Sequence, residues 1–256
     1  MSPAKQLRVL ILLLLLLPLV IVAFWERDPR PEWTDTLTVG VYPYNADDSP
    51  EVRRHLEMID SDHFDPVEAW LTEQAARYRL PLDRPFEIRL GHRLAQAPPL
   101  PPRAGSYWQR LKWAVNLRWW HWRLATGELE PDIVLVARYS TVDGQHLDLH
   151  SIGMSSPRLG LVSLSVSERL GGLNHVMLAH ELLHTVNAPD LYDSATGLPQ
   201  FPNGYAAPNE TPLYPQPAAE IMAGRIPVGP ESARQARSLA QCLIGQRTAR
   251  DIGWLH

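Results

Sequence analysis

The fold and the chemistry of this chain are decided by one stretch, His180-Glu181-Leu182-Leu183-His184-Thr185-Val186-Asn187-Ala188-Pro189-Asp190. On a helix, positions i and i+4 lie on one face, so the imidazoles of His180 and His184 can reach a single metal ion. Glu181 follows the first histidine and can accept a proton from water bound to that metal. This spacing is the H-E-x-x-H signature, which predicts a Zn2+ cofactor and hydrolysis, usually of peptide bonds.

The residues before the signature predict that it lies on a helix with a buried face. Apolar side chains recur at helical spacing, at Leu173, Val176, Met177, Leu183 and Val186. We expect Asn174, which follows two glycines, to be the N-cap of this helix. The opposing interpretation is a surface helix that carries the two histidines and the glutamate by accident.

A catalytic zinc usually takes three protein ligands and a water molecule, so a third donor is needed. Asp190 stands six residues beyond His184, and Asp193 stands three further on. The sequence resembles the metzincin metallopeptidases, whose pattern is H-E-x-x-H-x-x-G-x-x-H/D followed by a methionine turn. This resemblance implies that His180, His184 and Asp190 are the zinc ligands and that Glu181 is the general base.

The sequence departs from this pattern at one position, and other ligands stay open. Asn187 occupies the glycine position of the pattern, but asparagine is the non-glycine residue that best tolerates left-handed backbone, so the turn after the helix can survive. Residues 184–193 are also similar to immune-inhibitor-A-type peptidases, which keeps Asp193 as an alternative third ligand. A gluzincin-like site would use a downstream glutamate instead, either Glu210, which prolines flank, or Glu220, which adjoins the expected methionine turn.

Further site residues are expected downstream. Residues 219–224 resemble the methionine turn, which implies that Met222 forms a hydrophobic floor beneath the zinc, although a methionine in an apolar stretch is also common as plain core. We expect substrate to add a strand to the edge strand predicted at 159–165. The sequence does not select among the possible hydrogen-bond donors to the oxyanion, Tyr192, Tyr205 and Tyr214.

The N-terminal region sets the expected compartment. Residues 1–8 are basic and are interpreted as a cytoplasmic n-region, residues 9–25 are apolar and predict a transmembrane signal anchor, and residues 26–35 form a linker. This arrangement places residues 36–256, the predicted metallopeptidase domain, outside the cytoplasm, in a bacterial periplasm or at the cell surface. The alternative is a protein secreted after cleavage of the apolar run as a signal peptide.

Composition restricts the partners. Cys242 is the single cysteine among 256 residues, so no intramolecular disulfide can form. The net charge of -4 gives no indication of nucleic-acid binding. The expected partners are a protein or peptide substrate, from the H-E-x-x-H signature, and a membrane, from the N-terminal apolar run.

The order of the predicted elements is typical of an α+β, zincin-like fold. Such a fold has a twisted mixed β-sheet, an active-site helix, a methionine turn and a C-terminal helix. Periodicity and turn residues predict helices at 66–80, with Asp65 as its cap, and at 107–125. They predict strands at 36–42, 86–90, 132–139, 145–153 and 159–167.

The predicted helix 107–125 contains five tryptophans and four basic residues and no acidic residue. One apolar face, expected to lie on the sheet, consists of Trp113, Leu117, Trp120 and Leu124. A second apolar face flanked by bases predicts contact with lipid headgroups, and it consists of Trp108, Val115, Trp119 and Trp122. The alternative is that proline-rich loops bury this second face.

Two other interpretations remain. On the predicted strand 145–153, His146, Asp148 and His150 would share one face, which is either a second metal site or a solvated edge. The chain as a whole could be a non-catalytic zinc-containing scaffold, tethered to a membrane, or an envelope interaction protein. Glu181 favours the enzyme, because a scaffold needs no general base.

Overall fold

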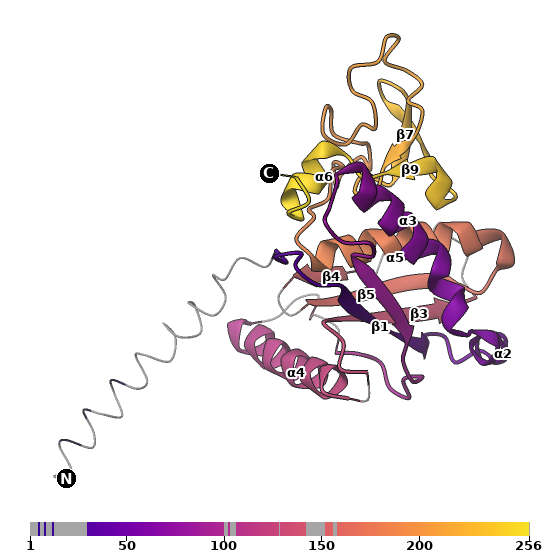
Figure 1. The fold of residues 1–256 in the computed structure, drawn as a ribbon. Helices are drawn as coiled ribbons and strands as arrows, with labels where there is room; N and C mark the ends of the chain where they lie inside the picture. Colours follow the sequence, from indigo (N-terminus) through magenta and orange to yellow (C-terminus); the bar gives the residue numbers. More distant parts are fainter. Residues whose placement is uncertain are drawn as a thin grey trace.

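The computed structural model describes residues 30–99, 102, 106–127, 129–141, 152–155 and 158–255, together with Lys5, Arg8 and Leu12. A five-stranded sheet with strand order β2-β1-β3-β5-β4 forms its centre (Figure 1). The neighbouring strands β2, β1, β3 and β5 are parallel, and β4 is antiparallel to β5. The protein is therefore α+β with a mixed sheet, as the sequence predicts. The strands are β1 (Leu37–Asn45), β2 (Phe86–Leu90), β3 (Ile133–Ser140), β4 (Ile152–Ser155) and β5 (Arg158–Ser165).

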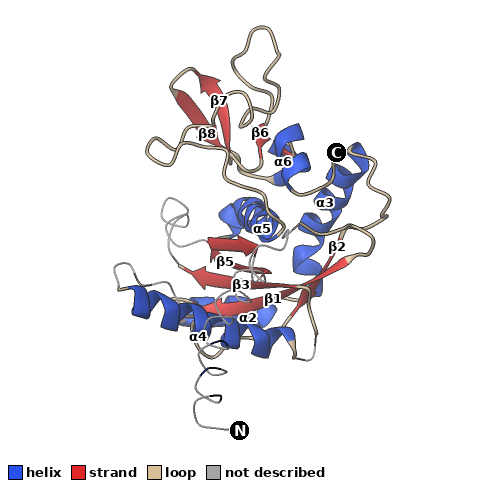
Figure 2. Cartoon of the chain, turned by 90° about the vertical axis from the view of Figure 1, so that its left-hand side faces the viewer, coloured by secondary structure: helices blue, strands red, loops and turns tan. Residues whose placement is uncertain are grey.

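The sheet is covered by helices on both faces (Figure 2). The helices α3 (Asp65–Arg77) and α5 (Gly171–Thr185) cover one face, and α4 (Tyr107–Ala125) covers the other. This arrangement explains the continuous apolar run of β3, because both faces of a parallel strand in such a sheet are buried. Ile133 and Leu135 belong to the cluster under α3 and α5, whereas Val134 and Val136 pack under α4.

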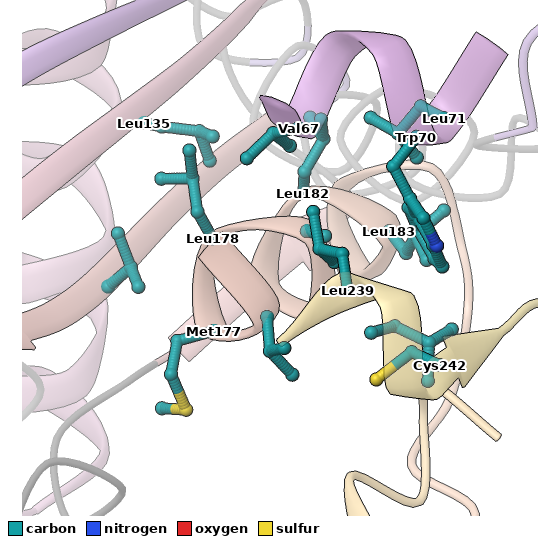
Figure 3. Close-up of a cluster of buried hydrophobic side chains, with 14 of the residues drawn as sticks. Val67, Trp70, Leu71, Leu135, Met177, Leu178, Leu182, Leu183, Leu239 and Cys242 are labelled. Atoms are coloured by element: carbon teal, nitrogen blue, oxygen red, sulfur yellow. The ribbon is translucent and has the colours of Figure 1, made fainter. Parts of the chain in front are cut away.

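The chain after α5 folds over this helix, on the side away from the sheet (Figure 1). It contains two short ladders, β6 (Ala219–Glu220) with β9 (Cys242–Leu243), and β7 (Arg225–Gly229) with β8 (Ser232–Gln235). The last helix is α6 (Gln246–Asp251). The helix α5 is thereby enclosed between the sheet and the C-terminal region. Figure 3 shows side chains of α5, among them Leu178 and Leu182, together with Val67 and Leu71 of α3, Leu135 of β3 and Leu239 of the C-terminal region.

Several predicted elements are confirmed and others are corrected. The strand 86–90 and the helix 107–125 have the predicted bounds, and the strands predicted at 36–42, 132–139 and 159–167 shift by one to three residues. The helix α2 (Pro50–Met58) and the short strands β6, β7, β8 and β9 were not predicted. Short 3-10 helices are η1 (Ser61–Phe64), η3 (Glu168–Leu170) and η4 (Leu239–Gln241).

Helix starts differ from the prediction. The helix α5 begins at Gly171, so Asn174 is not its cap; instead, the Asn174 amide is buried and bonds both backbone polar groups of Ser165 in β5. The helix α3 includes Asp65, and Phe64 is the residue at its cap position. Both helices therefore begin before the residue that local capping rules predict as the first helical residue.

The prediction of a transmembrane helix at 9–25 is corrected. Within the described part of the chain, no helix is long and apolar enough to cross a membrane, and Leu12 is the one described residue of that run. A second correction concerns the sheet edge: β5 is an internal strand, because β4 pairs with its outer side. The residues His146, Asp148 and His150, proposed as a second metal site, lie outside the described residues.

Candidate metal centre

Three side-chain atoms meet where α5 ends. His180 Nε2 and His184 Nε2 are 3.0 Å apart, and Asp190 Oδ1 lies 3.2 Å from each of them. Atoms at these separations share a point about 2 Å from all three, which is the bond length of zinc to nitrogen and oxygen ligands. Two imidazoles and a carboxylate also leave a fourth position for water, as catalytic zinc sites do. The residues present therefore fit a zinc ion.

Both histidine rings are oriented by backbone carbonyl groups. His180 Nδ1 lies 3.0 Å from the oxygen of Ile221, and His184 Nδ1 lies 2.7 Å from the oxygen of Ala188. A carbonyl oxygen can only accept, so the proton of each neutral ring is on Nδ1 and the lone pair of Nε2 faces the common point. Such hydrogen bonds are the usual support of metal-binding histidines.

The turn that follows α5 brings Asp190 to the histidines. The helix ends at Thr185, and Asn187 adopts a left-handed conformation with φ of 85°. The amide groups of Asn187 and Ala188 donate to the carbonyls of His184 and Leu183, which is the Schellman pattern of helix ends. The expectation that asparagine permits the sharp turn is confirmed. The reversal of the chain at this point is what returns Asp190 to the helix face that carries the histidines.

Glu181 lies beside the donor atoms. The residue is 4% exposed, and one of its carboxylate oxygens lies within 4.8 Å of ring nitrogens of His180 and His184. The glutamate also lines the cavity that opens onto the histidines. This position allows the carboxylate to accept a proton from a water molecule held at the fourth position.

The site favours positive charge. Burial lowers the pKa of His180, but the hydrogen bond to Asp190, the charge of Glu181 and the Ile221 carbonyl together outweigh burial and raise this pKa to about 9. Burial raises the pKa of Asp190, but its bonds to His180 and His184 hold the pKa well below the usual range. Two carboxylates thus stabilise a cation at the point between the rings, and a divalent metal ion supplies such a charge.

The turn after β6 is hydrogen-bonded to the site. Its carbonyl at Ile221 holds the His180 ring, and Met222 is fully buried within it. The backbone oxygen of Met222 accepts from the amide of Leu191, 3.0 Å away, so the same turn fixes the segment that begins at Asp190. Met222 is thus buried in a turn that is hydrogen-bonded to both segments that carry the candidate ligands, α5 and the loop at Asp190.

Glu220 holds this turn in place rather than facing the histidines. Its two oxygens accept from the amides of Met222, Ala223 and Gly245 and from the Thr248 hydroxyl. Burial raises its pKa, and these hydrogen bonds oppose that rise. Because its oxygens are used in this way, Glu220 is not the ligand of a gluzincin-like site. The other glutamate considered, Glu210, is exposed in a loop.

The structure also places the remaining predicted residues. Asp193 is exposed, and its Oδ1 accepts from the amides of Ala195 and Thr196, so this carboxylate closes its own loop and lies outside the three-atom cluster. The hydroxyls of Tyr205 and Tyr214 bond each other at 3.0 Å, and neither residue lines the cavity. Tyr192 is the one candidate of the three that does.

A cavity of about 420 Å3 opens onto the histidines and Glu181. Its apolar wall comes from α5 and from the turn after β6, and its polar wall includes two residues of the β7–β8 hairpin, Arg225 and Gln235. Sequence reasoning missed both residues. The one available signal was that Arg225 directly follows the turn at 219–224, but only the fold brings it to the cavity.

A second group that the sequence did not reveal is a cluster of three histidines. The ring of His63 lies 6.2 Å from that of His55 and 6.0 Å from that of His175, measured between centroids. The Tyr139 hydroxyl is 3.4 Å from His63 Nε2. The three residues come from α2, η1 and α5, so no local spacing predicts their meeting.

Comparisons with known proteins leave the family open. No protein family and no curated protein matches the chain. Among solved structures, it is similar to a chain described as "Structure of a chaperone-substrate complex", with a TM-score of 0.34 and 15% identity. The match covers 87% of this chain and 35% of that chain, so this chain spans about a third of its length. A likeness of this degree carries no argument about function.

Proposed function

We propose that this chain is a zinc-dependent metallopeptidase with His180, His184 and Asp190 as ligands. The observation that carries the proposal is the triangle of 3.0–3.2 Å formed by the two Nε2 atoms and Asp190 Oδ1, with Glu181 beside it and a cavity in front. Likeness to the metzincins is part of the proposal and is supported by the spacing of these residues and by the buried Met222 in its turn.

The chemistry follows from the roles of the residues. A bound zinc ion would lower the pKa of its water molecule towards neutrality and polarise the substrate carbonyl. Glu181 accepts the proton of the attacking water and passes it to the leaving amine. We infer that Tyr192, which lines the cavity, donates a hydrogen bond to the oxyanion. The carbonyls of Ile221 and Ala188 keep the histidine rings fixed during the reaction.

The test compares the full-length parent with the variant Glu181→Gln. Both should bind about one zinc per chain, and the parent should cleave a denatured protein mixture in a chelator-sensitive manner. We expect Glu181→Gln to lose at least about 10²-fold in rate, the range of general acid–base catalysis. Glu168→Gln, an exposed glutamate just before α5, is the control and should keep parental activity. Zinc binding without cleavage in any form would favour the non-catalytic scaffold instead.

We also propose that the outer face of α4 contacts an anionic lipid surface. The supporting observation is that Trp108, Trp119 and Trp122 are 73%, 55% and 58% exposed, so the proline-rich loops do not bury this face. Trp113 and Trp120 of the inner face are half-buried and pack on the sheet, as predicted. Tryptophans flanked by arginines and a lysine, without an acidic residue, are typical of helices that bind membrane interfaces. Vesicle binding by the double variant Trp119→Ser, Trp122→Ser tests this proposal.

A further inference from the structure

The cavity in front of the histidines contains one arginine, Arg225, the first residue of β7. Its guanidinium lies against Gly197, since a Cβ atom on this glycine would be 3.8–4.0 Å from Cζ, Nη2 and Nε of Arg225. Both residues line the cavity. Gly197 has a φ of +67°, which favours glycine, and the missing side chain leaves the guanidinium uncovered on this side. The cation is thus presented to the cavity.

Among the described residues, the guanidinium has no acidic counterion. Within the described ranges of the chain, no hydrogen bond or ion pair involves the side chain of Arg225, although this residue is half-buried. Two acidic residues line the cavity, Glu181 and Asp190, and both are used at the candidate metal centre. A partly desolvated arginine is stabilised by an anion, and its planar fork matches a carboxylate.

The rest of the cavity defines what else the ligand carries. Apolar groups come from Leu173, Val176 and Met177 on α5 and from Ala223 in the turn. Gln235, on the neighbouring strand of the hairpin, pairs with Arg225 in register and adds an amide. A short chain of methylene groups that ends in a carboxylate suits this combination of an apolar wall and a cationic end.

We propose that Arg225 binds a carboxylate of the peptide substrate and so sets its specificity. This inference rests on the proposed peptidase function, because the cavity adjoins the candidate metal centre. The carboxylate is either an acidic side chain close to the cleaved bond or the C-terminal carboxylate of a short peptide. Arg225 is a specificity residue and takes no part in the bond cleavage itself.

The test uses peptide pairs that differ by one charge. Each pair contains glutamate or glutamine at one position near the cleaved bond, and each peptide is made with a free or an amidated C-terminus. We expect the parent to prefer the carboxylate about 10- to 100-fold in kcat/KM, which corresponds to a hydrogen bond to a charged group. The position of the preferred charge tells the acidic side chain from the C-terminus.

The variant Arg225→Gln should reduce this preference to nearly onefold, and Arg225→Lys should retain an intermediate preference, because a lysine keeps the charge without the fork. Arg234→Gln is the matched control, since Arg234 lies on the same hairpin, is exposed and does not line the cavity. It should keep the parental preference. Equal cleavage of both members of every pair by the parent, or an unchanged preference in Arg225→Gln, would overturn the inference.

A binding measurement separates this inference from the proposed function. Zinc-loaded Glu181→Gln protein is titrated with the same fluorescent peptides, and the double variant with Arg225→Gln is compared. Charge-dependent binding that the second change removes supports the carboxylate site, even if the parent cleaves no peptide and the peptidase proposal fails. Cleavage without any charge preference supports the peptidase and refutes the role of Arg225.

Discussion

The two long helices α5 and α4 lie on opposite faces of the same sheet and differ in what surrounds them. Ten of the 15 residues of α5 are buried, because the C-terminal region covers the side that the sheet leaves open. In α4, 19 residues long, only Leu117 and Leu124 are buried. The polar site thus lies on the more buried helix and the exposed tryptophans on the less buried one. Enclosure fixes the ligands of a metal site, whereas exposure leaves an apolar face available to a partner.

The largest expected effect is on stability, from Leu182→Ala in α5. Leu182 is fully buried between α5 and the rest of the main core. Removing such a side chain leaves a cavity and typically costs about 2–5 kcal/mol. Trp119→Ala in α4 removes a larger side chain that is half-exposed, and we expect less than about 1 kcal/mol. Urea denaturation of both variants measures the contrast, and equal losses would show that α4 is enclosed as α5 is.

A smaller loss is expected from Asn174→Ala. The buried Asn174 amide accepts from the Ser165 amide at 3.0 Å and donates to its carbonyl at 2.7 Å, which ties α5 to β5. The alanine would leave both backbone groups unpaired, at a cost of about 1–3 kcal/mol. Denaturation again gives the value. A loss below about 0.5 kcal/mol would mean that the helix is held on the sheet by apolar packing alone.

The cluster of His55, His63 and His175 predicts that the stability of the fold depends on pH. Burial lowers the pKa values of His55, His63 and His175, and in His63 and His175 the neighbouring histidine contributes as well. The unfolded chain then binds protons at higher pH than the folded protein, so stability is fully present above about pH 6.5 and decreases as the pH falls below it.

This decrease is measured by denaturation at pH 7.5 and pH 5.5. One histidine can contribute at most about 1.4 kcal/mol per pH unit, the limit set by one proton. We expect His63→Asn to reduce the pH dependence and the exposed His92→Asn to leave it unchanged. An equal reduction by the two substitutions would refute the cluster as its source.

The smallest effect on stability is expected on the outer face of α4, from the double variant Trp119→Ser, Trp122→Ser. Both side chains are more than half exposed, so the free energy of unfolding should change by less than about 1 kcal/mol. Binding to vesicles that contain an anionic lipid should fall at least severalfold in a sedimentation assay. Unchanged binding, or equal binding of the parent to neutral vesicles, would contradict an anionic lipid surface as the partner.

The same two helices show what the sequence could predict. The meeting of His180 and His184 depends on one helix, so helical spacing alone predicted it. Asp190 was expected from the resemblance to the metzincin pattern, with Asp193 as the alternative, and the turn after α5 brings Asp190 to the histidines. The tryptophan faces of α4 also followed from helical periodicity. The histidine pair and these faces need only the geometry of a single helix.

Features that depend on the long-range fold were missed or were wrong. The carbonyl of Ile221 reaches His180 across 41 positions of sequence, and Arg225 meets Gly197 only through the C-terminal loops. The strand β5 was expected at the sheet edge, but alternation does not reveal that β4 returns along its outer side. A transmembrane helix was predicted at 9–25 from the length of the apolar run, and no helix in the described part of the chain is long and apolar enough to cross a membrane.

The most direct test of the metal centre compares zinc binding in the full-length parent, Asp190→Ala and Asp193→Ala. The two aspartates are three residues apart, and only Asp190 lies at 3.2 Å from both histidine nitrogens. After dialysis against a weak chelator, elemental analysis should find about one zinc per chain in the parent and in Asp193→Ala, and much less in Asp190→Ala. Loss of zinc in Asp193→Ala with retention in Asp190→Ala would contradict the site, as would a parent that binds none.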